Sequence, residues 1–147
     1  MSLYAHFIND SPVKLWGLTS RERKLRVLKS AGVTDIADDL TIVPEKSSTL
    51  LLRGDYLFDD RVIHYLVQTP DVLLKISRAP TELFVAAHVA TGQAPEAIDI
   101  IEGTATTGAI TGVRIETLET LSISFQQRLL KFEPPFVLPI TPEAKHF

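Results

Sequence analysis

The sequence contains no cysteine among its 147 residues. This absence excludes disulfide bonds, thiolate zinc sites and cysteine nucleophiles, and it fits a reducing compartment. No apolar stretch approaches the roughly 18 residues that cross a bilayer. The N-terminus has no basic segment followed by an apolar one, so no signal peptide is indicated. The residues present therefore predict a soluble intracellular domain.

An excess of charge of one sign is missing as well. The chain has 15 Lys and Arg residues against 18 Asp and Glu residues, which gives a net charge of -3. No basic run is long enough to follow a phosphate backbone, so we expect no nucleic-acid partner and no attraction to an anionic membrane surface. Hydrophobic residues make up 45% and charged residues 22%, the balance of one folded domain with its own core.

Apolar runs of strand length alternate with stretches of helical spacing. Expected strands cover residues 3–8, 49–53, 71–77, 81–90 and 113–118, and short strands are expected at Ile36 and Ile42–Val43. Expected helices cover residues 19–31, 59–68, 94–103 and 118–132. This alternation predicts a three-layer α/β sandwich with a mostly parallel central sheet.

Local capping signals mark where two of these helices begin. Thr19 is followed three residues later by Glu22, which predicts a capping box, and Gly32 predicts a left-handed C-terminal cap. Leu25, Leu28 and Ala31, with Val27 beside them, define the expected buried face of this first helix. Asp59 or Asp60 is expected to cap the second helix.

Asp55 is the candidate metal ligand of this chain. It follows the non-alternating apolar run of residues 50–52, which is typical of a strand buried on both faces. Ligands of α/β sheets bind at the carboxyl ends of such strands, and a carboxylate there can hold Mg²⁺ against a phosphate. The alternative, which we favour, is that Gly54 and Asp55 form only a strand-to-loop turn.

Three segments in order resemble one group of proteins. "LWGLTSRERKLRVLKSAGVTDI" and "LLLRGDYLFDDRVIHYLV" are similar to two segments of sugar-phosphate-type nucleotidyltransferases, the second holding their metal-binding Asp at the position of Asp55. "RLLKFEPPFVLPITPE" looks like the segment that joins such a domain to the membrane domain of CDP-alcohol phosphotransferases. Order and spacing match over most of residues 4–142, although residues 77–115 carry no motif that aligns.

The resemblance implies a reduced nucleotidyltransferase-like (Rossmann-like) fold over residues 1–131. Residues 132–147 would be a proline-rich linker, extended rather than packed, toward a membrane domain that follows. The expected location is the cytoplasmic face of the membrane, in a protein of phospholipid or phosphoalcohol synthesis. The implied partners are the chain's own C-terminal membrane domain, a cytidine nucleotide and a second copy of the chain.

The chain departs from this family at the phosphate-binding loop. An active nucleotidyltransferase needs a Gly-rich loop with an Arg directly after the first strand. Here "HFI" runs into "NDSPVKLWG" with no glycine before Gly17. Lys14 is the candidate for a phosphate-facing lysine, with a solvated surface lysine as the alternative. We therefore expect a non-catalytic regulatory or docking domain; the alternative is an active cytidylyltransferase that makes a CDP-activated alcohol with Mg²⁺.

Histidines and surface arginines suggest no further site. The four histidines lack metal-ligand spacing and are expected to be structural: His6, His64, His88 and His146. Arg21 and Arg23 flank Glu22 and are expected to pair on a solvated helix face.

Overall fold

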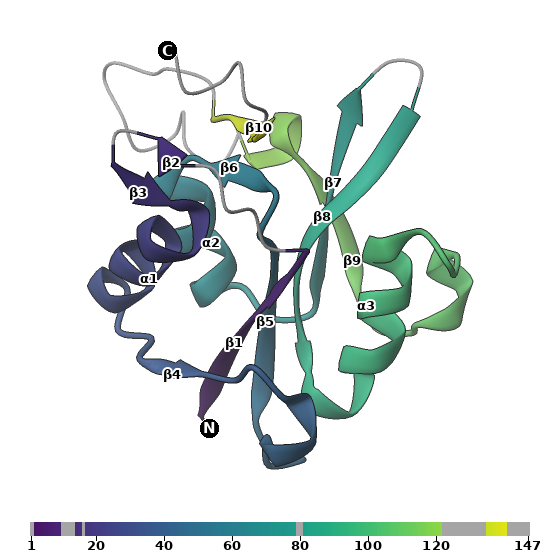
Figure 1. Cartoon of the computed structure of the whole chain (residues 1–147). Helices are drawn as coiled ribbons and strands as arrows, with labels where there is room; N and C mark the ends of the chain where they lie inside the picture. Colours follow the sequence, from purple (N-terminus) through teal and green to yellow (C-terminus); the bar gives the residue numbers. More distant parts are fainter. Residues whose placement is uncertain (1, 10–13, 16, 79–80, 122–134, 141–147) are drawn as a thin grey trace.

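The central element of the structure is a mixed six-stranded sheet (Figure 1). The computed structural model describes residues 2–9, 14–15, 17–78, 81–121 and 135–140. In these residues the sheet has the order β4-β1-β5-β8-β7-β9. Its strands are β1 (Leu3–Ile8), β4 (Asp35–Ile36), β5 (Ser48–Arg53), β7 (Val72–Arg78), β8 (Thr81–Ala90) and β9 (Arg114–Thr117).

Five of these strands run in one direction, and β8 runs in the other. Strand β1 is parallel to β4 and β5, and β7 is parallel to β9, whereas β8 is antiparallel to both β5 and β7. Only two residues separate β7 from β8, and a parallel pair needs a crossover of a dozen or more residues. The mostly parallel sheet is confirmed, with β8 as the exception.

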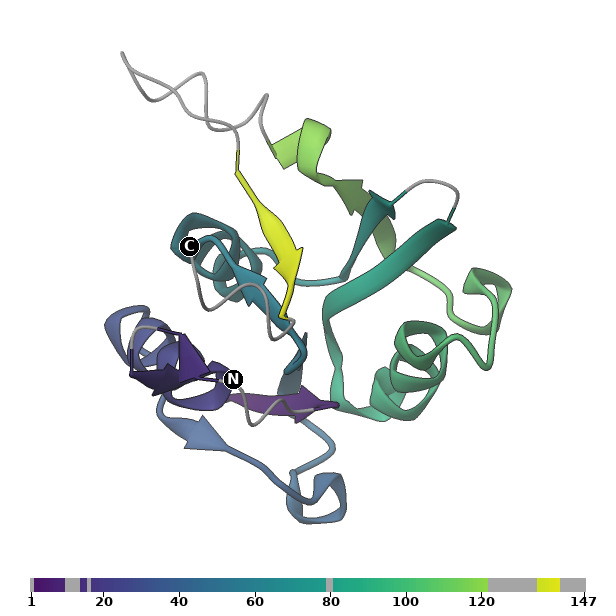
Figure 2. The same ribbon diagram turned by 45° about the horizontal axis from the view of Figure 1, so that its top comes forward.

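Helices flank the sheet on both faces (Figure 2). Helices α1 (Ser20–Ser30) and α2 (Asp60–Gln68) share one apolar core with the sheet, and α3 (Ala94–Glu102) packs on the other face in a second core. Leu50 and Leu52 of β5 point into the first core, and Leu51 points into the second. This two-sided burial explains the non-alternating apolar run and is compatible with a Rossmann-like α/β sandwich.

The predicted caps of the first two helices are confirmed. The backbone N–H of Glu22 donates to Thr19 Oγ1 over 3.1 Å, and that of Thr19 donates to Glu22 Oε1 over 3.0 Å. Gly32 adopts a φ of 86°, which an L-residue with a Cβ rarely takes. Asp59 caps α2 by accepting the N–H of Arg61 over 3.0 Å.

The buried face of α1 differs from the predicted one. Its buried residues are Ser20, Lys24, Val27 and Leu28. Leu25 and Ala31 are only half-buried. The helix is thus rotated about its axis so that a lysine takes a core position.

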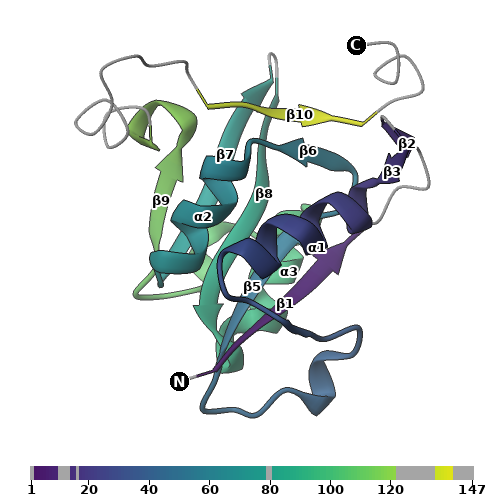
Figure 3. The same cartoon turned by 90° about the vertical axis from the view of Figure 1, so that its left-hand side faces the viewer.

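A short two-stranded sheet joins the end of the described chain to its middle, as Figure 3 shows. Strand β6 (Tyr56–Phe58), which the sequence did not predict, pairs antiparallel with β10 (Val137–Pro139). Val137 is buried in the first core. The expectation of an unpacked tail is therefore wrong for residues 137–139, because their backbone and one side chain bind the domain.

Two smaller regions complete the described chain. Strands β2 (Lys14–Leu15) and β3 (Leu18–Thr19) pair antiparallel. Leu40–Ile42 form a 3₁₀ turn capped by Asp39, so a strand at Ile42–Val43 is wrong. Residues 118–121 are helical, and the remainder of the helix expected over 118–132 lies outside the described residues. Among the helices described, none is long and apolar enough to span a bilayer.

Candidate functional site

The candidate site lies where β1 and β5 end side by side. After β1 the chain crosses to β4 on one side of it, and then returns to β5 on the other side. In α/β proteins, ligands bind at the carboxyl ends of the two strands between which the strand order switches in this way. Asn9 follows β1 with a φ of 54°, and Asp55 follows β5. The predicted placement of Asp55 at this edge is confirmed.

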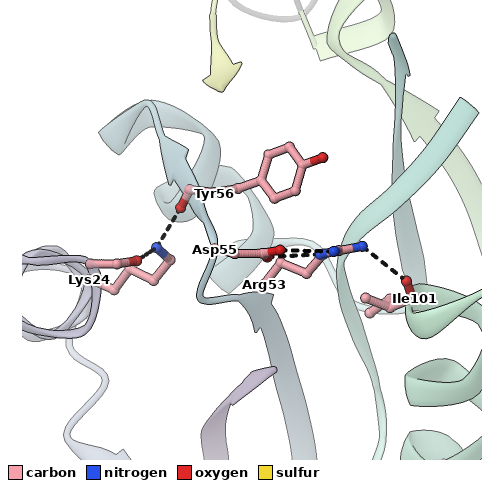
Figure 4. A network of polar contacts seen from close by, with 6 residues as sticks. Lys24, Arg53, Asp55, Tyr56 and Ile101 are labelled. Atoms are coloured by element: carbon pink, nitrogen blue, oxygen red, sulfur yellow. Dashed lines mark hydrogen bonds and ion pairs between the residues drawn. The ribbon is translucent and has the colours of Figure 1, made fainter. Parts of the chain in front are cut away.

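The carboxylate of Asp55 is held by the last residue of its own strand. Arg53 donates from Nε to Asp55 Oδ1 and from Nη2 to Asp55 Oδ2, each over 2.9 Å (Figure 4). The side chains of Arg53 and Asp55 are 17% and 33% exposed. This two-pronged geometry is the strongest form of a guanidinium–carboxylate pair, and it occupies both carboxylate oxygens.

Arg53 also connects β5 to α3 and to β6. Its Nη1 lies 3.4 Å from the carbonyl oxygen of Ile101, in the last turn of α3, where the helix dipole favours a positive charge. Its Cζ lies 5.2 Å from the ring centroid of Tyr56. The hydrogen bonds to Asp55 raise the pKa of Arg53 above its ordinary value, with burial acting in the opposite direction. Arg53 therefore stays charged and fixes the geometry of this edge.

The described residues do not fit a magnesium site at Asp55. Mg²⁺ is bound through one or two carboxylates together with substrate phosphates and water. Both oxygens of Asp55 already accept hydrogen bonds from Arg53. Within the part of the chain that the structure describes, no group of three His, Asp or Glu side chains could hold a metal. The observed pair agrees with the turn interpretation of Gly54 and Asp55. A metal at Asp55 stays a prediction, in which the ion would compete with Arg53 for the carboxylate.

Lys14, the candidate phosphate-facing residue, lies in β2 and pairs in register with Thr19 of β3. Residues 10–13, which lead from β1 toward it, lie outside the described residues. The role of Lys14 in binding a phosphate therefore stays a prediction.

Lys24 is a feature of this edge that the sequence interpretation missed. It is only 3% exposed, and its Nζ donates to the carbonyl oxygen of Tyr56 over 2.6 Å and to Ser20 Oγ (Figure 4). The ammonium also lies 5.3 Å from the ring centroid of Phe58. Lys24 thus ties α1 to the backbone of β6. Its spacing from the buried Val27 and Leu28, at i+3 and i+4, is the signal that could have placed it inside.

The histidines that the structure describes bind neighbouring chain segments. Nδ1 of His6 lies 2.7 Å from the Ala37 carbonyl, and Nε2 of His64 lies 3.1 Å from Ser30 Oγ. His88 is 4% exposed, and its Nδ1 donates to the Leu66 carbonyl over 2.6 Å. Burial lowers the pKa of His88, although this hydrogen bond and the charge of Asp71 oppose the shift. His146 lies outside the described residues.

The surface arginine of α1 has a different partner from the expected one. Arg21 Nη2 lies 3.1 Å from Asp38 Oδ1, and its Cζ lies 5.1 Å from the ring centroid of Phe7. Arg21 therefore connects α1 to the segment after β4.

Comparison of the chain with protein-family models and with curated proteins gives no match in either case.

Proposed function

We propose that this chain carries a non-catalytic, nucleotidyltransferase-like domain that docks on a membrane CDP-alcohol phosphotransferase and regulates or assembles it. The partner would be the chain's own C-terminal membrane domain, reached through residues 132–147. The domain would then lie on the cytoplasmic face of the membrane and help to form a homodimer. Support comes from the mixed α/β sheet with its ligand edge at β1 and β5, and from the three segments that resemble this family.

The Arg53–Asp55 pair is the observation that carries the non-catalytic half of the proposal. In the family that the sequence resembles, the carboxylate at this position holds a metal. Here a guanidinium from the same strand end occupies both of its oxygens. A metal ion would have to compete with this partly buried pair for the carboxylate, and this competition opposes catalysis.

The course of β10 supports the docking half of the proposal. The backbone N–H of Ile140 donates to the Asp55 carbonyl over 2.8 Å, and that of Asp59 donates to the Phe136 carbonyl over 2.9 Å. The segment that would lead toward the membrane domain is thus attached on both sides of β6. A docking domain needs a C-terminal segment that is held in place, because a flexible linker would not fix the orientation of the domain relative to its partner.

Two measurements test the catalytic question. We expect the purified chain to release no pyrophosphate from CTP and Mg²⁺ with glycerol 3-phosphate or inositol 1-phosphate. Titration calorimetry should show that Mg²⁺ does not strengthen CTP binding, because Arg53 binds the Asp55 carboxylate. Pyrophosphate release that Asp55→Asn abolishes, and that the matched surface change Asp38→Asn leaves intact, would establish the active cytidylyltransferase instead.

The docking part of the proposal is tested separately, by reading the coding sequence that follows codon 147. Beyond codon 147 we expect apolar stretches of at least roughly 18 residues, long enough to cross a bilayer. If translation stops there, or continues without such a stretch, docking on an own membrane domain is excluded.

A further inference from the structure

Helix α3 is too short to cover the sheet against which it packs. Its 9 residues span about 14 Å, whereas the 10 residues of β8 span about 33 Å. It covers the part of the sheet around Leu51 and Leu73, and it ends at Glu102. Beyond this end a cavity of about 450 Å³ opens between the sheet, the C-terminus of α3 and residues 103–107. This volume is in the range of small-molecule sites.

Part of the sheet surface in this cavity is apolar. Ile115 of β9 pairs with Leu73, so that both side chains lie on the α3 face, yet Ile115 is 44% exposed. Phe84 of β8 packs at the margin of the same core and also lines the cavity. A ligand with an apolar group would remove this surface from water, at about 25 cal/mol per Å².

The polar side of the cavity carries charges of both signs. Arg53 lies at one end, where three of its five N–H groups donate to described atoms and two are left for a ligand. Lys75 lies 3.2 Å from Glu82, in an ion pair whose side chains are 27% and 62% exposed. Glu102 is exposed at the C-terminus of α3, where the helix carbonyls add negative potential.

We propose that this cavity binds a small zwitterion that carries an apolar group. The anionic group would bind the remaining N–H groups of Arg53, with Lys75 nearby. The cationic group would lie at Glu102, and the apolar group would cover Phe84 and Ile115. The proposal does not depend on the function proposed above, because the cavity lies on the α3 face and uses neither oxygen of Asp55.

The balance of charge favours a zwitterion over a simple ion. A free anion would meet Glu82 and Glu102 as well as the two cations, and a free cation would meet Arg53 and Lys75. A ligand that carries both charges can place each of them beside a group of opposite sign, and like-charge contacts discriminate against ligands with one charge.

A ligand panel with matched charges tests the proposal. The probes are L-phenylalanine, a carboxylate zwitterion, and phosphocholine, a phosphate zwitterion; their counterparts with one charge are N-acetyl-L-phenylalanine, phenethylamine and choline. Binding is followed by two-dimensional ¹H–¹⁵N NMR titration of the whole chain. We expect at least one zwitterion to bind about tenfold more tightly than its counterparts, as one charge-assisted hydrogen bond provides. Which of the two binds identifies the anionic group.

Variants locate the binding. Glu102→Gln should weaken binding of the zwitterion about tenfold, and it should not weaken binding of N-acetyl-L-phenylalanine, whose single negative charge Glu102 repels. Ile115→Ser should weaken every ligand with an apolar group. Glu45→Gln and Ile42→Ser change the same residue types outside the cavity and should have no effect. The proposal is overturned if neither zwitterion binds at millimolar concentration, if the singly charged counterparts bind equally well, or if the control variants weaken binding as much.

Discussion

The pair of Arg53 and Asp55 can be tested as an energy. We expect a double-mutant cycle with Arg53→Met, Asp55→Asn and the double variant to give a clear coupling free energy. The geometry favours coupling, because two hydrogen bonds of 2.9 Å join the groups and the arginine side chain is only 17% exposed. The third contact of Arg53, to the Ile101 carbonyl, is lost in both arms that lack the arginine and therefore cancels from the cycle.

The burial of the two groups sets the expected magnitude. Fully exposed ion pairs contribute about 0.2–1 kcal/mol, and hydrogen bonds to charged groups contribute about 1.5–3 kcal/mol. Asp55 is 33% exposed, so water still screens part of the interaction. We therefore expect a coupling free energy of about 1–2 kcal/mol in favour of folding.

Urea unfolding followed by far-ultraviolet circular dichroism provides the measurement. The matched control is the pair of Arg21 and Asp38, which has one contact of 3.1 Å and side chains that are 36% and 83% exposed. Its coupling should stay below about 0.5 kcal/mol. If the Arg53–Asp55 cycle gives no more than this control, the guanidinium does not hold the carboxylate in solution. Asp55 would then be available to a metal, and the non-catalytic proposal would lose its main support.

Three further predictions concern the core, the first helix and pH. Leu51→Ala should lower the free energy of unfolding by about 2–5 kcal/mol, because Leu51 is fully buried. Ile42→Ala, at a position that is 70% exposed, should change it by less than about 0.5 kcal/mol. Similar effects of the two variants would contradict the described core. Thr19→Ala should cost about 1 kcal/mol through loss of the capping box, and Thr19→Ser should restore most of it. The lowered pKa of His88 means that the unfolded chain takes up a proton first as the pH falls below the ordinary value of 6.5. Stability should therefore fall on acidification below that pH, with a slope from this group of at most about 1.4 kcal/mol per pH unit, until the folded chain also binds the proton. His88→Gln should flatten this part of the urea-unfolding profile, and an unchanged profile would assign it to other groups.

Local signals predicted what local interactions determine. Thr19 and Glu22 bind each other's backbone N–H groups within one helical turn, so their spacing alone locates the start of α1. The run of residues 50–52 likewise predicted a strand buried on both faces, because side chains that alternate between faces must all be apolar there.

Strand pairing between segments far apart in the chain could not be predicted from local sequence signals. Strand β6 has three residues and depends on β10, about eighty positions later in the chain, for its partner. The proline content of the tail suggested an extended chain, which is right for the backbone of residues 137–139. It could not reveal that Val137 would be buried, because that depends on which surface the extended segment meets.

The state of Asp55 could have been inferred from its immediate neighbours. Arg53 ends its strand and Asp55 lies in the turn that follows, so an Arg-x-Asp sequence at a strand end places opposite charges only two residues apart. The apolar run and the Gly54–Asp55 sequence locate the end of the strand. Arg53, two residues before Asp55, indicates that the carboxylate has a cationic partner. A carboxylate at a ligand edge is a metal candidate only after its own strand has been examined for a cation.

Three contacts at the end of β5 connect it to α3, to the tail and to α1. Arg53 binds the last turn of α3, the Asp55 carbonyl accepts the N–H of Ile140, and Lys24 of α1 donates to the carbonyl of the next residue, Tyr56. A change at the tail would therefore act on the backbone of Asp55 directly, and through Arg53 on the end of α3 that forms the proposed zwitterion cavity. At the position where the nucleotidyltransferases that the sequence resembles hold a metal, this chain has contacts that join residues 137–140 to the proposed ligand cavity. The proposed docking role needs such contacts, because binding free energy at the cavity can bias the tail only through contacts that both share.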